Sequence, residues 1–393
     1  MIFTMESKFG SPPILDERPP HLSPPQPADS TPHISHADRG FTPPPISNFQ
    51  SPIPTQPSYN PPMSTITIPA RTNANTHPNL RPLSILRDLP AVADLIELCF
   101  SETMDSEGKR YVQDMRRAGS DNSFIKWANR AAETTSLPLT GYIWEEDGCI
   151  VGNASLVPFK HRKQRIYLIA NVAVHPTHRG RGIARALTER AVQHAREKKI
   201  NNIWLHVRHD NPQAIHLYTQ LGFIERARRT SWQAATDLHL QKLDTDIAIT
   251  SRYSTLWQTQ LNWLLRLYPP ALAWHRDWNI NSLRPGFWNW LYLLFIDMNI
   301  RQWAAMRPST GSGTDLQATL SWIPNRRGES LFAAAGQKSD PEALTALLIH
   351  ARREIYHHYP NIAFDFPVSQ FDEAIAAAGF KPTRTLIWMQ ATS

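Results

Sequence analysis

Cysteine is scarce in this chain, and its scarcity excludes two classes of protein. Only Cys99 and Cys149 occur among 393 residues. Two cysteines are too few for a disulfide framework, and their spacing fits no metal-ligand motif. We therefore expect a reducing, cytoplasmic location and no bound metal.

Long apolar runs are also missing. The N-terminus lacks the apolar core of a signal peptide. The most hydrophobic stretch, Trp288–Ile296, has nine residues and is followed by Asp297, whereas a bilayer span needs about 20. We expect this stretch to be a buried helix or strand, and we expect no membrane partner.

The N-terminal part has few large apolar side chains, and its first 70 residues hold about half of the 33 prolines. Such a composition cannot bury enough apolar surface to offset backbone entropy. We predict an extended, disordered Pro-rich tail over residues 1–79. A dispensable extension or overcalled start is one interpretation, and a ligand for a proline-binding domain is another.

The net charge is +7, yet no nucleic-acid-binding module has a signature here. Part of the excess forms a group along the sequence: Lys160, Arg162, Lys163, Arg165, Arg179, Arg181 and Arg185. Aromatic residues are not interleaved with this group, as they are in many nucleic-acid-binding surfaces. A phosphate-rich small ligand explains the charge more economically, so we expect no nucleic-acid partner.

Apolar periodicity predicts alternating strands and helices between residues 83 and 232. The predicted elements are a short strand and helix within 83–100 with Asp88 as the cap, helix within 106–133, a hairpin over 142–157, strand 166–174, helix 183–199, strand 203–207, helix 212–221 and strand 224–232. Short connections make strands 166–174 and 203–207 parallel neighbours. The fold class is α/β, with a central mixed sheet flanked by helices.

The loop between strand 166–174 and the next helix reads His-Arg-Gly-Arg-Gly-Ile-Ala up to Ala184. The first backbone N–H groups of a helix have no partner within it and favour an anion. Gly180 and Gly182 lack a Cβ, so the backbone can approach a phosphate closely. The dinucleotide-binding motif Gly-x-Gly-x-x-Gly does not fit, because its third glycine is missing.

A second motif follows strand 203–207, with Asn211, Ile215, Leu217, Tyr218, Gly222 and Phe223 at fixed spacing. Together, the two motifs resemble those of the Gcn5-related N-acetyltransferases. The nearest likeness is to the N-terminal acetyltransferases of ribosomal proteins. The close match covers residues 166–223, and a looser one covers about 83–232. This resemblance implies an acyl-CoA N-acyltransferase fold with acetyl-CoA as co-substrate.

The resemblance also implies a role for each motif residue. The backbone of Val172, Ala173 and Val174 would bind the pantetheine arm and thioester. The pyrophosphate would be held by Arg179, Gly180, Arg181, Gly182, Ile183 and Ala184. Asn211 would bond to the pantetheine, and Tyr218 would protonate the leaving thiolate. The amine attacks the thioester directly, so neither cysteine needs a role.

The general base departs from the family pattern. The relatives carry a glutamate on the strand before Asn211, and the matching position here is His206. Histidine has an unperturbed pKa of about 6.5, which suits a base at neutral pH. A polar residue that only lines the cleft is the alternative, and Glu145 is a second candidate base.

The C-terminal part repeats the first. A shift of 157 residues moves Gly222-Phe223 onto Gly379-Phe380 and aligns two helices without a gap. The same shift moves Tyr218 onto Ile375 and replaces the glycine loop and Asn211 with residues of other types. We predict an acetyltransferase domain over 80–240 and a degenerate, non-catalytic copy over 245–393. The copy would pack on the first domain and could complete the acceptor site.

The sequence thus predicts an enzyme that transfers acetyl from acetyl-CoA to a primary amine, either on a small molecule or at a protein N-terminus. A non-catalytic acyl-CoA-binding adaptor or sensor is the alternative from another class, and a longer acyl group is a second alternative. The acceptor and the oligomeric state have no signature in the sequence.

Overall fold

A computed structural model describes residues 77–104, 106–120, 140–235, 245–275, 279–295, 299–308, 314–323, 329–355 and 362–392. The predicted Pro-rich tail lies outside the described residues, apart from its last three. The elements fall into two halves that repeat one order.

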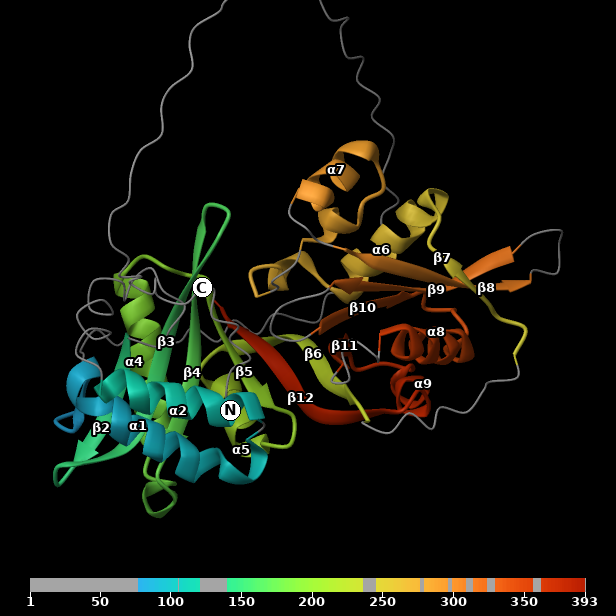
Figure 1. Ribbon diagram of the computed structural model, residues 1–393. Helices are drawn as coiled ribbons and strands as arrows, with labels where there is room; N and C mark the ends of the chain where they lie inside the picture. The colour runs from blue at the N-terminus through green and yellow to red at the C-terminus, as the bar shows by residue number, and fades with distance from the viewer. Residues whose placement is uncertain are drawn as a thin grey trace, which may run out of the picture. The chain divides into compact units, whose positions relative to one another are not determined.

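The first half alternates strands with helices, as the sequence predicts (Figure 1). Its strands are β1 (Leu80–Pro82), β2 (Thr140–Glu146), β3 (Cys149–His161), β4 (Gln164–Val174), β5 (Ile203–Arg208) and β6 (Phe223–Ala234). Its helices are α1 (Ile85–Phe100), α2 (Ser106–Ser120), α4 (Ile183–Glu197) and α5 (Pro212–Gln220).

The second half follows the same order. Its strands are β7 (Ala248–Ser251), β8 (Arg301–Pro308), β9 (Thr314–Ile323), β10 (Glu329–Ala335), β11 (Ile362–Pro367) and β12 (Phe380–Ala391). Its helices are α6 (Trp257–Leu267), α7 (Phe287–Phe295), α8 (Pro341–Ile355) and α9 (Asp372–Ala377). The bounds of β12 lie 157 residues after those of β6, which is the shift of the sequence repeat.

All twelve described strands form one sheet, in the order β1-β2-β3-β4-β5-β12-β6-β11-β10-β9-β8-β7. The only parallel pairs among them are β4 with β5 and β10 with β11. The expected mixed sheet and the parallel neighbours 166–174 and 203–207 are therefore confirmed.

The last strands of the two halves are exchanged. β12 of the second half pairs with β5, while β6 of the first half pairs with β11. β6 and β12 also pair with each other over their whole lengths (Figure 1). Each half thus completes its sheet with a strand from the other, and the two sheets become one.

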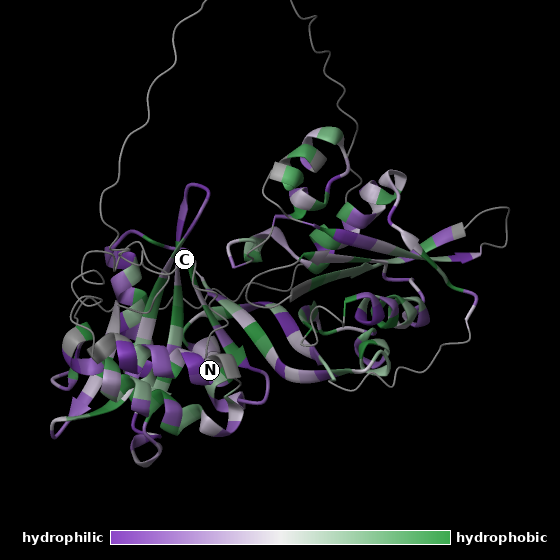
Figure 2. Ribbon diagram, viewed as in Figure 1, coloured by the Kyte–Doolittle hydropathy of each residue, from purple (hydrophilic) through white to green (hydrophobic). Residues whose placement is uncertain are grey.

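The faces of the first half's sheet are covered by different helices. Leu187 and Ala191 of α4 pack with Leu156, Ile169 and Leu205 on one face. α1 and α2 pack with Ile143 on the opposite face. In Figure 2 the sheet between these layers is largely hydrophobic, whereas α2 is mostly hydrophilic on its outer side.

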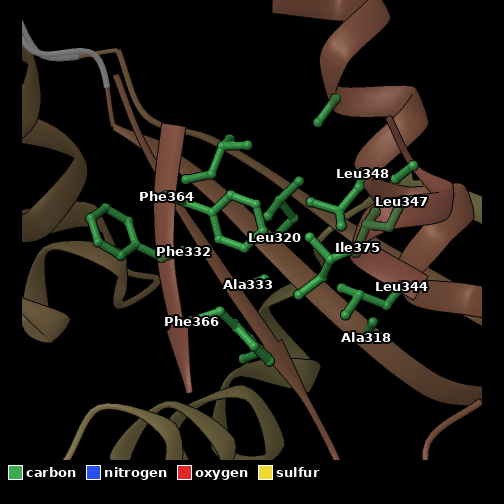
Figure 3. Close-up of a cluster of buried hydrophobic side chains, with 14 of the residues drawn as sticks. Ala318, Leu320, Phe332, Ala333, Leu344, Leu347, Leu348, Phe364, Phe366 and Ile375 are labelled. Carbon is green, nitrogen blue, oxygen red and sulfur yellow. The ribbon is translucent and has the colours of Figure 1, made fainter. Parts of the chain in front are cut away.

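The second half has its own core, in which α8 and α9 pack on the strands (Figure 3). Leu344, Leu347 and Leu348 of α8 gather with Leu320 of β9 and Ile375 of α9. Ile375 is fully buried at the position that the repeat assigns to Tyr218.

Two local expectations need correction. Helix α1 begins at Ile85, so Asp88 is not its cap; the Asp88 carboxylate instead accepts from the Ser84 N–H, 2.7 Å away. The stretch at Trp288 forms helix α7, but Trp288 is 79% exposed rather than buried. Helix α2 is described over Ser106–Ser120, and the remainder of the predicted helix, residues 121–133, lies outside the described part and stays a prediction.

Candidate functional site

The parallel strands β4 and β5 separate halfway along their length. They pair only from Tyr167 to Ile169 and from Ile203 to Leu205. Just beyond, Asn171 has a φ of 50°, and the register with β3 shifts by one residue. Such a bulge bends a strand and leaves backbone groups outside the ladder. The Val174 carbonyl, for example, accepts instead from Arg179 Nε at 3.2 Å and from Cys99 Sγ at 3.3 Å.

The glycine loop follows β4 directly and begins α4. Gly180 and Gly182 have φ angles of 79° and 80°, which favour glycine. A Cβ on either glycine would meet no atom within 4 Å, so this side of the loop is open among the described residues. The N–H groups after Gly182 therefore start a helix at an exposed turn, where the helix dipole favours an anion.

The loop arginines have partners of their own. Arg181 makes two hydrogen bonds to the Glu146 carboxylate, at 2.9 and 3.0 Å. The Trp144 indole N–H and then Arg181 hold the pKa of Glu146 below its usual value. Arg179 and Arg181 are both exposed, while Ile183 is buried and Ala184 is half-buried. The loop backbone is thus open to an anion, and the two exposed arginines already have partners of their own.

The basic group seen in the sequence divides in space. Lys160, Arg162, Lys163 and Arg165 lie around the turn before β4, whereas Arg179, Arg181 and Arg185 lie beyond its other end. A strand of this length spans about 30 Å. A single phosphate-rich ligand at the glycine loop therefore does not explain all seven basic residues.

Tyr218 lies in α5, and Asn211 directly precedes this helix. Asn211 caps the helix, because its Oδ1 accepts from the Ala214 N–H at 3.0 Å. Tyr218 is 5% exposed and packs in the core that includes Leu205 and Val207. Burial raises the pKa of Tyr218, and its hydroxyl makes no hydrogen bond within the described part of the chain. The phenol is therefore neutral and able to donate a proton.

His206 lies on the opposite face of β5. Leu205 and Val207 face the Tyr218 side, whereas Trp204 belongs to a cluster with Trp274 and Trp388. His206 is 3% exposed, and its ring lies 4.9 Å from that of Trp388. Burial, followed by repulsion from His275 and Arg384, holds the pKa of His206 well below 6.5. The ring is therefore unprotonated at neutral pH but weakly basic.

The second candidate base, Glu145, is engaged elsewhere. Its carboxylate lies 2.6 Å from Arg81 and 2.7 Å from Arg87. These two arginines also hold Asp88. Glu145 is thus part of an ion-pair network beside β1.

Sequence reasoning missed several residues around this site. Trp274, His275, Arg384 and Trp388 surround His206 from the second half of the chain, far away in sequence. Asn153 of β3 is fully buried, and its amide nitrogen donates to the Asn171 carbonyl at 2.8 Å. The sequence signals Asn153 only as a polar residue inside an apolar strand, and this does not distinguish a buried side chain from an exposed one.

The corresponding region of the second half is filled by its own side chains. The Tyr268 hydroxyl donates to the carbonyls of Ala333 in β10 and Asp365 in β11, at 3.3 and 3.5 Å. Arg266 donates to the Ala335 carbonyl at 2.7 Å. Tyr268 thus joins the two strands beyond their last parallel pair, Ser330 with Ala363.

Neither a metal site nor a membrane-spanning helix occurs among the described residues. No group of three or more His, Cys, Asp or Glu side chains there could hold a metal ion. None of the described helices is both long and apolar enough to cross a bilayer.

Two known acetyltransferases are similar to part of this chain. Streptothricin acetyltransferase of Streptomyces lavendulae is 40% identical over 77 residues, which cover 20% of this chain and 40% of that protein. Ribosomal protein bS18-alanine N-acetyltransferase of Escherichia coli is 37% identical over 67 residues, covering 17% of this chain and 45% of that protein. This chain thus spans less than half the length of both relatives.

A GCN5-related N-acetyltransferase from Sphaerobacter thermophilus aligns with 80% of this chain and 95% of its own, at 14% identity and a TM-score of 0.46. The pattern of the acetyltransferase (GNAT) family matches residues 92–223, which include β4, the glycine loop and α5. The likeness to the acetyltransferase (GNAT) family thus lies in residues 92–223.

Proposed function

We propose that the chain is an N-acetyltransferase that transfers acetyl from acetyl-CoA to a primary amine. The observation that carries this proposal is the separation of β4 from β5 beside an exposed glycine loop. Backbone groups of Val172, Ala173 and Val174 would bind the pantetheine arm and thioester. The pyrophosphate would lie on residues 179–184, where helix α4 begins.

Two side chains supply the chemistry in this proposal. The amine nitrogen attacks the thioester carbonyl, the new C–N bond forms and the C–S bond breaks. Tyr218 gives its proton to the leaving thiolate, a role that suits a buried neutral phenol. The nitrogen loses its proton to His206 or to solvent. Asn211 retains its amide N–H groups for the pantetheine, because only its oxygen caps α5.

The second half has a supporting role in this proposal. We assign catalysis to residues 80–240 and a degenerate, non-catalytic copy to 245–393, and the tail to 1–79. Tyr268 between β10 and β11 supports this division, because it uses backbone carbonyls that a pantetheine arm would need. The second half would instead complete the acceptor side around His206. A cytoplasmic location is part of the same proposal.

The acceptor is proposed by class only. Relatives named for a ribosomal-protein alanine, for spermidine and for streptothricin support either a protein N-terminus or a small-molecule amine. His206 replaces the glutamate of the relatives, so their acceptors do not decide between these two classes.

A thiol-release assay tests the proposed activity. Purified protein with acetyl-CoA should release free thiol with at least one of spermidine, glucosamine and an alanine-initiated peptide. Tyr218→Phe should lower kcat by about 10²-fold or more while leaving the acetyl-CoA Kd within about twofold. Tyr142→Phe is the matched control, because Tyr142 is equally buried but bonded to His194.

The result also separates the two classes of function. Tight acetyl-CoA binding with no thiol release from any amine would favour an acyl-CoA-binding adaptor. A large loss of acetyl-CoA affinity in Tyr218→Phe would contradict its role as the acid.

A further inference from the structure

Two buried asparagines on neighbouring strands each leave an amide oxygen unused. Asn153 of β3 and Asn171 of β4 are both 0% exposed. Within the described residues, neither Oδ1 atom has a hydrogen-bond partner. Buried polar atoms are nearly always paired, so two such oxygens on neighbouring strands require an explanation.

The nitrogens of the same amides hold both side chains in place. Asn153 Nδ2 donates to the Asn171 carbonyl at 2.8 Å and to Ser155 Oγ at 3.2 Å. Asn171 Nδ2 donates to the Tyr111 hydroxyl of α2 at 2.8 Å. Because Asn153 Nδ2 faces a carbonyl oxygen, its amide cannot be reversed without a clash of acceptors. The Asn153 amide is therefore fixed with its oxygen as an unpaired acceptor, and the Asn171 amide, as placed on Tyr111, also presents its oxygen.

These asparagines lie beside the strand segment that would bind the thioester. Asn171 is the bulge residue at which β4 leaves β5, and it directly precedes Val172 of the proposed thioester site. Asn153 stands opposite Ile143, which packs against α1 and α2. The amides thus lie on the α1–α2 face of the sheet, the same face as His206.

We propose that the Asn153 and Asn171 oxygens accept the two N–H groups of a primary amine and so direct its lone pair at the thioester. This inference rests on the proposed function and defines its acceptor as an uncharged primary amine. A pair of neutral oxygens does not favour the ammonium form as a carboxylate would. After attack, one N–H proton passes to His206 or to solvent, and Tyr218 supplies the proton that the thiolate takes up.

A secondary amine has one N–H group and cannot satisfy both oxygens. Ethylamine and dimethylamine have the same atoms and nearly the same size, so they form a matched pair of probes. Because the proposed contacts involve only the amino group, ethylamine at high concentration should be acetylated. We expect its kcat/KM to exceed that of dimethylamine by about tenfold or more, equivalent to 1.4 kcal/mol.

Two variants remove the oxygens separately. Asn153→Leu keeps the side-chain size, and Asn171→Gly tolerates the φ of 50°. Both should lower kcat/KM for ethylamine about tenfold or more and reduce the preference over dimethylamine to below about threefold. Calorimetry should find the acetyl-CoA Kd within about twofold of wild type in both variants. If Asn153→Leu does not fold, as thermal unfolding would reveal, Asn171→Gly carries the test.

Gln260→Leu is the matched control. Gln260 lies in the second half, is 0% exposed and has an Oε1 without a partner among described residues. It should cost stability but leave the amine preference unchanged.

The outcomes are distinguishable. A wild-type protein that binds acetyl-CoA but does not distinguish the two probes, or does not acetylate ethylamine, overturns this inference and leaves the proposed function to the other amines. Variants that keep the preference show that the oxygens serve the fold or hold water, and this also overturns it. A wild-type protein that does not bind acetyl-CoA overturns the proposed function as well.

Discussion

Burial sets the protonation of both side chains that we propose for catalysis. Tyr218 and His206 lie on opposite faces of the sheet, each at most 5% exposed. Burial favours the neutral form of each, and so raises the pKa of the phenol and lowers that of the imidazole. The phenol keeps its proton for the leaving group, while the imidazole is a weak base. An amine that arrives uncharged needs no stronger one.

The buried imidazole should make stability depend on pH. The pKa of His206 is lowered in the folded state, so below about pH 6.5 the unfolded chain binds a proton that the native protein does not. Its contribution to stability is therefore present above about pH 6.5 and is lost as the pH falls. Urea unfolding between pH 5 and 7 should show a slope of up to about 1.4 kcal/mol per pH unit from this group.

His206→Leu should remove that slope. His216 is exposed on α5, so His216→Gln should leave the slope in place. An unchanged slope in His206→Leu would show that another group causes the pH dependence.

The elements that carry the motif residues could be predicted from the sequence, whereas the buried polar residues could not. Tyr218, Asn211 and the glycines could be predicted because their spacing matches a known motif on strand–loop–helix elements. Asn153 and Asn171 could not, because a polar residue in a strand reads equally well as one facing solvent. Their effect depends on a bulge and on Tyr111 of α2, which the sequence does not connect to them.

Among the elements, the turn into α4 is the one on which the proposed pyrophosphate site depends. Gly182 has a φ of 80°, and Gly148 in the β2–β3 turn has a φ of 77°. Neither would bring an added Cβ within 4 Å of another atom. The two glycines therefore differ in location but not in local strain.

This pair gives a controlled test of the loop. Alanine at either position should cost about 1–2 kcal/mol of stability, because L-residues disfavour this conformation. Gly182→Ala should also raise the acetyl-CoA Kd about tenfold, since the helix N–H groups move, whereas Gly148→Ala should not change it. Calorimetry with denaturant unfolding measures both quantities. Equal affinities in the two variants would move the pyrophosphate away from this loop.

The hairpin of β2 and β3 and the parallel pair of β4 and β5 could be predicted from apolar patterns and short connections. The start of α1 could not, because Asp88 resembles a cap but lies one turn inside the helix. The partners of β6 and β12 could not either. Both strands follow equivalent helices with similar patterns, so the sequence does not say which sheet each one joins.

For the whole molecule, the internal repeat raises the question of how many acetyl-CoA molecules bind. In the second half Tyr268 joins β10 to β11, and Trp263 lies 3.2 Å from where a Cβ on Gly336 would stand. We therefore expect one acetyl-CoA per chain. Isothermal titration should give a stoichiometry near 1. Gly182→Ala should weaken this binding without revealing a second site. A stoichiometry near 2 would contradict a non-catalytic second half.

Because β6 and β12 are exchanged, neither half of the chain has a complete sheet without the other. Cleavage of the connection between Ala235 and Thr245 would cut the chain, yet each piece would still hold a strand of its neighbour's sheet. A chain truncated after residue 240 would lack β12, the strand that pairs with β5 beside His206, and we expect it to be inactive. The two fragments on either side of this connection, produced together, should instead associate and form the complete sheet.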